Sequence, residues 1–441
     1  MFNQSQIGWL IGLLRERYSI DLKIDLLGGN LYLYNENITS AIVFDNPNEG
    51  FRTFGYSKLG CKQWDPNEEG FIDLLGCGIS SPGLGEGVVF ETVGGNTYCH
   101  YDILGLAYWC LNRLEEIGVE TLDNHGRYFY KESHAFRYGY LEFPIVDQWL
   151  DILRQVILRS WPEIKLKEHK YEMVVTHDVD RPSRYLFCKS FSQFFKFALY
   201  DLKVDKNLLA FVKSFWSYVN KEELHPFDPY NTFEWIMDVS ERNNIISRFY
   251  FICGGDTILD ADYKITDSAI IRLIERITNR NHEIGLHPSY GTYLSKNMIH
   301  NEIRNLREVL PDYNQDVGGR MHYLRFKYPD TLRNLEAAGL VYDSTLGYAE
   351  HIGFRCGTSF EYVPFDPVEN RIINIKIIPL IFMDVTLYSY MGLKLDETSL
   401  RRVQELKRKC YIFGGRFTIL WHNSNFTKLM QKEFYEKLFK L

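Results

Sequence analysis

The chain has 441 residues, of which 45% are hydrophobic and 24% charged, a composition typical of a globular protein with more than one domain. Its formal net charge is −7 and it has no Lys/Arg-rich run, which argues against nucleic acid as a partner. Eight cysteines are scattered without a C-x-x-C pair, so they predict reduced thiols rather than a zinc or redox centre.

The first segment, residues 1–27, lacks the basic start, the long apolar core and the small-residue cleavage site of a secretory signal. No other segment has the apolar length that crosses a membrane. We therefore expect a cytoplasmic protein without a membrane span.

Residues 1–165 predict a smaller N-terminal α/β domain. A strand-like apolar run at 41–44 is surrounded by glycine-rich turns, and residues 103–117 and 145–158 carry apolar side chains at helical spacing. A charged linker is expected near residues 160–171.

Two polar segments of this domain, residues 64–70 and 123–127, allow two interpretations. Their polar and charged side chains suit contacts with a sugar, but the same residue types are equally typical of ordinary turns. The role of the N-terminal domain therefore stays open.

Residues 172–441 alternate strand-like and helix-like segments, which predicts a parallel sheet with helical crossovers. About seven such units indicate an α/β fold of the distorted (β/α) barrel type. Residues 183–231 interrupt the alternation and are expected to form a helical insertion of the kind that covers a site. The expected strands are 173–175, 249–253, 283–286, 320–324, 341–342, 372–378 and 417–421, and the expected helices are 267–278, 296–310, 329–338 and 397–409.

The first of these strands ends in two carboxylates, in the sequence Thr176-His177-Asp178-Val179-Asp180. Residues two apart on a strand point to the same side, so Asp178 and Asp180 are expected to reach one pocket, at the strand end where barrel enzymes hold catalytic groups. A bound cation would relieve the repulsion between two like charges, because it binds one carboxylate as a ligand and leaves the other free as a base.

Two neighbouring motifs carry further candidate groups. His287 follows the expected strand 283–286, and a neutral imidazole there suits zinc, although a lone histidine is more often a structural hydrogen-bonding group. Arg320 and His322 lie two residues apart on one expected strand. There Arg320 would either orient a catalytic carboxylate or form a surface salt bridge.

A last candidate, His422, follows the apolar run 417–421. A histidine at a strand end above a pocket can act as a general acid, and Asp384 is a candidate for the carboxylate that orients it.

This ordered set of motifs, over residues 172–425, resembles the polysaccharide deacetylase family of metal-dependent carbohydrate deacetylases. The Asp-x-Asp variant of that family matches THDVD, HEIGLH matches the strand before its first metal histidine, and LWH matches its late histidine. The resemblance implies Asp178 as the catalytic base, Arg320 as the residue that orients it, His422 as the acid, and Asp180 and His287 as metal ligands. The N-terminal part resembles only an uncharacterised domain that accompanies some bacterial members.

One position departs from the family pattern. Family members usually carry a second metal histidine four residues after the first, and here that position is Gly291. Three alternatives stay open: His322 supplies the missing ligand, water completes the set, or metal binding has been lost. His177 is a weaker substitute, because its side chain is expected to point away from the face that Asp178 and Asp180 share.

The resulting hypothesis is a metal-dependent hydrolase that removes an N-acetyl group from an amino sugar in a glycan or glycan precursor. It would use a divalent metal, with zinc as the first choice and nickel, cobalt or manganese as alternatives. Tyr290 and Trp421, which neighbour the motif histidines, are expected to bind the substrate. The competing hypotheses are a carbohydrate-binding or scaffold protein with a decayed site, and a hydrolase of a non-sugar C–N bond.

Overall fold

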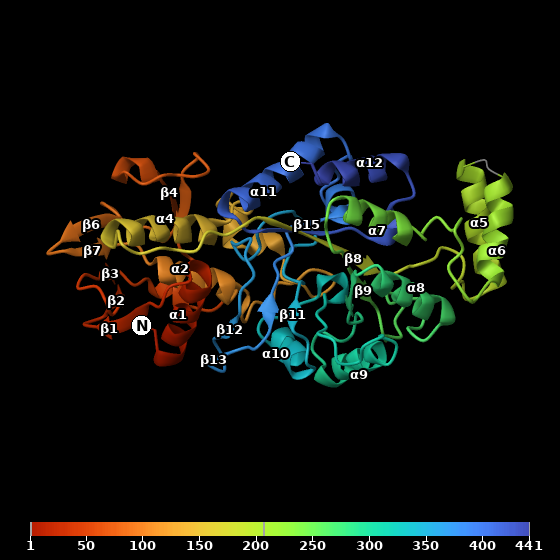
Figure 1. Ribbon diagram of the computed structural model, residues 1–441, viewed down its shortest axis with the longest axis horizontal. Helices are drawn as coiled ribbons and strands as arrows, with labels where there is room; N and C mark the ends of the chain where they lie inside the picture. Colours follow the sequence, from red (N-terminus) through yellow and green to blue (C-terminus); the bar gives the residue numbers. More distant parts are fainter. Residues whose placement is uncertain (1, 206–207, 441) are drawn as a thin grey trace.

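The computed structural model of the protein describes residues 2–205 and 208–440. It is a mixed α/β structure in which the elements of the N-terminal third, coloured red to yellow, occupy one end of the long axis (Figure 1). The green to blue elements that follow form the rest of the molecule. No described helix is both long and apolar enough to cross a membrane.

The N-terminal part contains a five-stranded sheet of order β1-β2-β3-β7-β6, in which only β3 and β7 pair in parallel. A smaller sheet pairs β4 with β5, and the buried helix α2 packs on α4. The elements of this part are α1 (Gln4–Tyr18), β1 (Lys23–Leu27), β2 (Asn30–Tyr34), β3 (Ile42–Phe44), β4 (Cys61–Trp64), β5 (Ile79–Pro82), β6 (Phe90–Val93), β7 (Asn96–Cys99), α2 (Ile103–Leu111), α3 (His134–Arg137) and α4 (Ile145–Ser160).

The C-terminal part is built on a parallel sheet of order β10-β9-β8-β16-β15. Its strands are β8 (Glu172–Val179), β9 (Arg248–Phe251), β10 (Glu283–Leu286), β11 (Tyr342–Asp343), β12 (Phe365–Asp366), β13 (Arg371–Ile372), β14 (Lys376–Ile377), β15 (Phe382–Met383) and β16 (Arg416–Leu420). Its helices are α5 (Phe191–Asp205), α6 (Leu208–Val219), α7 (Phe233–Arg242), α8 (Ser268–Asn279), α9 (Lys296–Arg307), α10 (Asp330–Ala337), α11 (Glu397–Phe413) and α12 (Leu429–Leu438).

Helix α8 illustrates how apolar spacing places a helix against this sheet. Ile270, Leu273, Ile274 and Ile277 occupy positions i, i+3, i+4 and i+7, which lie on one face of the helix, and all four are buried. The polar residues between them face solvent, as in other amphipathic helices.

The parallel sheet does not close into a hydrogen-bonded ring. Beyond β10 it continues only through single bridges at Gly319 to Leu286 and Asp343, and then through the parallel pair β11–β14. Among the described residues no ladder joins β14 to β15. The structure thus shows a mixed α/β fold with a parallel sheet, whereas the complete barrel is not shown.

The predicted strand at 320–324 is wrong. Only Gly319 makes bridges there, and His322–Leu324 form a single 3-10 turn in which Tyr323 and Leu324 have φ angles of 61° and 54°. Two successive non-glycine residues in the left-handed region end any strand. Elsewhere β10 coincides with the expected strand 283–286, and α1, α7, α12 and β15 are additional elements.

The predicted insertion contains the helical hairpin α5–α6. Its base is held by Asp228, in the segment before α7, which accepts hydrogen bonds from Ser183 Oγ at 2.5 Å and from Ser217 Oγ of α6 at 2.7 Å. Arg184 pairs with Asp201 of α5. The hairpin projects at the end of the molecule opposite the N-terminal sheet (Figure 1).

The two parts of the chain share one continuous hydrophobic core. Polar contacts also cross between them: Trp9 Nε1 donates to the Val363 carbonyl, and Asp147 of α4 accepts hydrogen bonds from Thr358 and Ser359. The linker near residues 160–171 stays a prediction.

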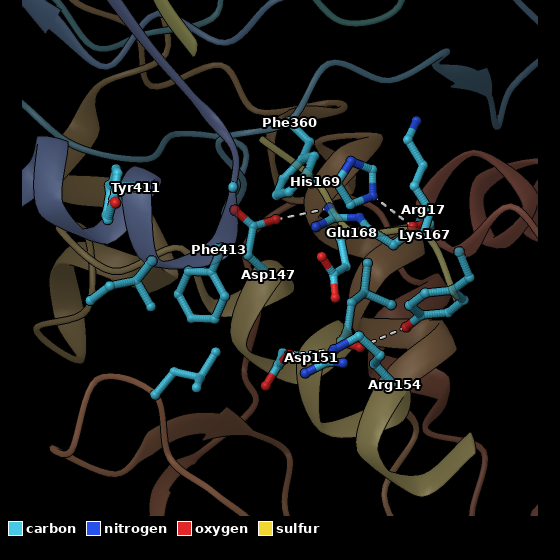
Figure 2. Close-up of a pocket in the computed structure, with 15 residues that line it drawn as sticks. Arg17, Asp147, Asp151, Arg154, Lys167, Glu168, His169, Phe360, Tyr411 and Phe413 are labelled. Atoms are coloured by element: carbon cyan, nitrogen blue, oxygen red, sulfur yellow. Dashed lines mark hydrogen bonds and ion pairs between the residues drawn. The ribbon is translucent and has the colours of Figure 1, made fainter. Parts of the chain in front are cut away.

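A cavity of about 310 Å³ lies where α1, α4 and α11 meet (Figure 2). Two ion pairs lie in its wall: Arg17 lies 2.9 Å from Asp147, and Arg154 lies 2.9 Å from Asp151. The group of described side chains that could hold a metal lies elsewhere, at the carboxyl edge of the parallel sheet.

Candidate metal centre and catalytic cavity

Asp178 and Asp180 lie at the carboxyl end of β8, in the centre of the parallel sheet. Asp178 is buried, and Arg320 Nη1 donates to its Oδ1 at 3.0 Å. The guanidinium is itself fixed, because it also donates to Thr176 Oγ1 and to the carbonyl and hydroxyl of Ser344. The clamp leaves Asp178 Oδ2 facing the cluster of histidines, 3.6 Å from His287 Nε2.

His287 follows β10 and is held in one tautomer by the backbone. Its Nδ1 lies 2.5 Å from the carbonyl oxygen of Arg320, which can only accept a hydrogen bond. Nδ1 therefore carries the proton, and the lone pair of Nε2 faces Asp180 Oδ1 at 3.3 Å. Histidines that bind metals typically donate a hydrogen bond from one ring nitrogen to a carbonyl and offer the lone pair of the other nitrogen to the metal, as His287 can here.

His322 completes the cluster from the turn after Gly319. Its Nε2 lies 3.8 Å from Asp180 Oδ2, and its Nδ1 lies 3.5 Å from Asp260 Oδ1. Three ligand atoms, one each from Asp180, His287 and His322, all lie within 4.8 Å of one another. These three residues could therefore hold a metal ion.

Two orphaned atoms support this fit. Asp180 Oδ1 and His322 Nδ1 are buried and have no hydrogen-bond partner among the described residues. For Asp180 the nearest imidazole nitrogen presents a lone pair, so acceptor faces acceptor unless a cation lies between them. Carboxylate oxygen and imidazole nitrogen are ligands that zinc and comparable divalent metals accept.

The cluster polarises its own members. Burial acts to raise the pKa of Asp180, but His322 and His287 outweigh it and bring that pKa well below the ordinary value. Burial acts in the opposite sense on His322, where Asp180 and Asp260 raise the pKa to about 9.

His422 lies at the end of β16 and forms an ion pair on the cavity wall. Its Nδ1 lies 2.8 Å from Asp384 Oδ1, and its Nε2 lies 3.7 Å from Asp180 Oδ2. Burial alone would lower the pKa of His422, but Asp384 outweighs that effect and raises the pKa to about 10. His422 is therefore an imidazolium at neutral pH, with the Nε2 proton directed into the cavity.

A cavity of about 480 Å³ opens over these groups. Part of its wall is apolar, from Leu324, Ala349, Met383, Val385 and Leu420. Tyrosine rings and two arginines line the rest: Tyr230, Tyr323, Tyr390, Arg127 and Arg181.

Of the site residues predicted from the sequence, the structure brings Asp178, Asp180, His287, His322 and His422 to the cavity and places Arg320 directly behind Asp178. Asp384 contacts His422 as expected. His177 points away from the cavity, where its Nδ1 lies 2.6 Å from the Trp421 carbonyl.

The two aromatic residues expected to bind substrate do not line the cavity. Trp421 is fully buried and stacks on Phe426 at 5.3 Å, because alternation along β16 turns Leu420 toward the cavity and Trp421 into the core. Tyr290 lies beside the cavity, packed edge-on against Tyr323 and under the guanidinium of Arg325.

Sequence reasoning missed two groups near the metal cluster. Asp260 lies in the loop after β9, where it faces His322 and accepts a hydrogen bond from the Tyr290 amide. Arg127 belongs to the N-terminal part, yet it lines the cavity and donates to the Tyr323 carbonyl at 2.9 Å. For segment 123–127 the sequence allowed either contact with a sugar or an ordinary turn, and no sequence pattern placed Asp260.

Comparisons with known proteins are sparse. Residues 39–162 match a family of unknown function, DUF7033. All three residues of the metal cluster lie outside this range. No curated protein matches the sequence. A crystal structure described as that of a putative polysaccharide deacetylase from Mycobacterium smegmatis is similar over 62% of this chain and 86% of that chain, with 15% sequence identity and a TM-score of 0.40.

Proposed function

We propose that the protein is a metal-dependent hydrolase that removes the N-acetyl group from an amino sugar in a glycan or glycan precursor. The observation that carries the proposal is the convergence, in one cavity, of a possible metal cluster with two opposite ion pairs. These are Asp178 with Arg320 and His422 with Asp384. We also propose that the open parallel sheet is a distorted (β/α) barrel.

Asp180, His287 and His322 would hold the metal. A divalent cation in that position supplies Lewis acidity toward the acetamide oxygen and lowers the pKa of water. One carboxylate and two imidazole ligands favour zinc or a comparable divalent metal.

Asp178 acts as the general base in this proposal. Arg320 binds Oδ1 and leaves Oδ2 free on the side of the cluster, where it takes the proton of the attacking water. The buried guanidinium keeps a positive charge beside the carboxylate and fixes its orientation.

His422 acts as the general acid. Attack of water on the acetamide carbonyl gives a tetrahedral oxyanion, and the C–N bond breaks when the amine nitrogen receives a proton. His422 holds that proton on Nε2, because Asp384 raises its pKa to about 10. The products are acetate and a free amino sugar.

The walls of the cavity fit the two halves of such a substrate. The apolar side suits the methyl of an acetyl group, and tyrosine rings suit the faces of a sugar.

The test is release of acetate by the metal-loaded protein. N-acetylglucosamine oligosaccharides, nucleotide-linked N-acetylhexosamine and a non-sugar acetamide would be compared, each with and without a chelator and with Asp178→Asn. We expect release from a sugar substrate that both changes abolish. Release that neither change affects would disprove the mechanism.

Elemental analysis tests the bound metal that the proposal requires. Stoichiometric metal that is lost in the double variant His287→Ala/His322→Ala is expected. A protein that takes up no metal and still binds glycans would favour the binding role, and release only from the non-sugar acetamide would move the activity to another substrate class.

A further inference from the structure

The hairpin α5–α6 carries an unusual amount of exposed apolar surface. Phe191, Phe195 and Leu199 follow one another at four-residue spacing on α5 and are 52, 38 and 50% exposed. On α6, Val212, Phe215 and Trp216 are 50, 45 and 59% exposed. Stripes of this kind normally face a core or a partner.

The hairpin already has a small core of its own on the other side. Phe194 and Ala198 are buried there, and the ring of Phe194 stacks on Tyr218 of α6 at 4.7 Å. The exposed stripes are therefore additional to the surface that holds the two helices together. The ring centroids of Phe215 and Phe194 are 6.3 Å apart, so the exposed ring of Phe215 lies along the seam between the two helices.

Cations flank these stripes. Lys196 and Lys203 are exposed on α5, and among the described residues neither forms an ion pair. Lys213 on α6 lies over the ring of Phe227. The nearby Asp201 does not offset them, because Arg184 and the Tyr185 hydroxyl occupy its carboxylate. In sequence, residues 191–219 carry four lysines against two aspartates, Asp201 and Asp205, so this aromatic element has a net positive charge on a chain whose net charge is −7.

We propose that the α5–α6 hairpin binds the surface of an anionic phospholipid membrane, with both helices lying in the interfacial plane. Aromatic and aliphatic side chains enter the boundary of the acyl chains, while flanking lysines keep their ammonium groups among the headgroups. Resting on the proposed deacetylase function, we further infer that the amino sugar is attached to a lipid.

A second copy of the chain fits this surface less well. In a two-fold symmetric dimer the same patch meets itself, so the lysines of one hairpin would face the lysines of the other. An anionic lipid surface instead offers each lysine an opposite charge.

The hairpin is close enough to the cavity to deliver such a substrate. It follows β8 directly, and Arg184 at its base donates to the hydroxyl of Tyr230, which lines the cavity. Leu259, on another part of the cavity wall, is next to Ile258, whose side chain is 92% exposed. Two apolar projections therefore flank the site.

Sedimentation with vesicles tests the docking. The full chain is mixed with vesicles of phosphatidylcholine alone or of phosphatidylcholine with phosphatidylglycerol. We expect binding to the anionic vesicles only, which falls with added salt and is lost in the double variant Phe215→Ser/Trp216→Ser. Lys196→Gln and Lys203→Gln should each weaken binding about five-fold, from about 1 kcal/mol per lysine. Leu429→Ser, which removes an exposed leucine from α12, is the matched control and should bind as the wild type does.

Two outcomes would overturn the docking. One is equal sedimentation of the wild type with and without anionic vesicles. The other is a concentration-dependent dimer that Phe215→Ser/Trp216→Ser converts to monomer while vesicle binding is absent, since this would make the hairpin a self-association surface. The lysine variants keep the test valid if the double variant fails to fold.

The substrate inference is tested separately. A lipid-linked N-acetylhexosamine in vesicles should be deacetylated more slowly by Phe215→Ser/Trp216→Ser, while turnover of a soluble oligosaccharide stays unchanged. Equal turnover of both by wild type and variant would overturn the lipid-linked substrate. Vesicle binding by Asp178→Asn at the wild-type level is expected in any case, so failure of the deacetylase function would leave the docking supported.

Discussion

In the proposed mechanism, the ion pairs Asp178–Arg320 and His422–Asp384 divide the base and acid roles between the two sides of the cavity. A buried arginine stands behind Asp178, and a buried carboxylate, Asp384, stands behind His422. Arg320 fixes the orientation of Asp178, and Asp384 raises the pKa of His422, so an oriented carboxyl group and an imidazolium lie within one site. Mutations at these positions should therefore separate binding of metal from turnover.

Replacing Asp178 by Asn should remove the base and keep the metal. We expect a loss of about 10²- to 10⁴-fold in kcat, as for other general bases, with the dissociation constant of the metal changed much less. Single-turnover assays and competition with a chelator measure the two quantities. A variant that loses its metal along with its activity would show instead that Asp178 is a ligand.

The pH dependence of stability reports on His422. Its pKa in the folded protein is raised from 6.5 to about 10, so the protonated form stabilises the fold. In metal-free protein this contribution is complete below pH 6.5, declines as the pH rises toward about 10, and is absent above it.

Chemical denaturation across that range tests this contribution. The difference in free energy of unfolding between wild type and His422→Gln should follow the same decline. His300→Gln, which changes an exposed histidine of α9, is the control. A difference that does not vary with pH would contradict the assigned pairing.

At the scale of elements, the metal cluster depends on a turn in an unfavourable conformation. His322 begins the turn His322–Leu324, and the two residues after it have positive φ angles, which cost energy for non-glycine residues. The N-terminal segment 123–127 holds this turn: Arg127 donates to the Tyr323 carbonyl, and Arg325 Nε donates to the His125 carbonyl. A role of the N-terminal part in the site follows from these contacts.

Replacing Arg127 by Gln should release the turn and weaken the hold on the metal. We expect the dissociation constant of the metal to rise at least about tenfold, as for other residues that support ligands from behind. Arg127→Lys keeps the charge but not the fork of donors, so its dissociation constant for the metal should lie between those of the wild type and Arg127→Gln. Arg159→Gln, at an arginine packed on Phe71 outside the cavity, should bind metal normally. Wild-type affinity for the metal in Arg127→Gln would show that Arg127 does not support the turn that carries His322.

The strand ends were predictable because they depend on local patterns. The run before His287 is short, apolar and bounded by polar residues, and it became β10 as expected. Arg320 contacts Asp178, as the sequence suggested, but the strand expected around Arg320 was wrong. That strand failed because the turn at Tyr323 is held by distant side chains, which no local pattern reveals. Asp260 was missed for the same reason: it lies in a loop without periodicity, and only the fold brings it to His322.

At the scale of the whole molecule, the two parts of the chain are joined by a buried ionic network as well as by the shared core. Glu116 of the N-terminal part accepts two hydrogen bonds from Arg355 of the C-terminal part, at 2.9 and 2.7 Å, and a third from Arg113. All three side chains are nearly inaccessible to solvent. We therefore expect the two parts to unfold together.

Replacing Glu116 by Gln should leave the buried Arg355 without its carboxylate, whereas Arg113 keeps its ion pair with Glu115. Breaking a buried pair in this way typically costs about 3–5 kcal/mol. Calorimetry should show one transition, shifted to lower temperature. Glu86→Gln, at an exposed pair with Lys62, should leave it almost in place. Two separate transitions, only one of which moves in Glu116→Gln, would contradict a single cooperative unit.

Arg320 acts on the site through two chemically different parts of one residue. Its guanidinium clamps Asp178, whereas its main-chain carbonyl fixes the tautomer of His287. Every amino acid carries that carbonyl, so a substitution at this position removes the clamp and spares the ligand. Under the proposed function, a relative that lost catalysis through a change at position 320 would still bind metal, so metal content alone would not distinguish it from an active enzyme.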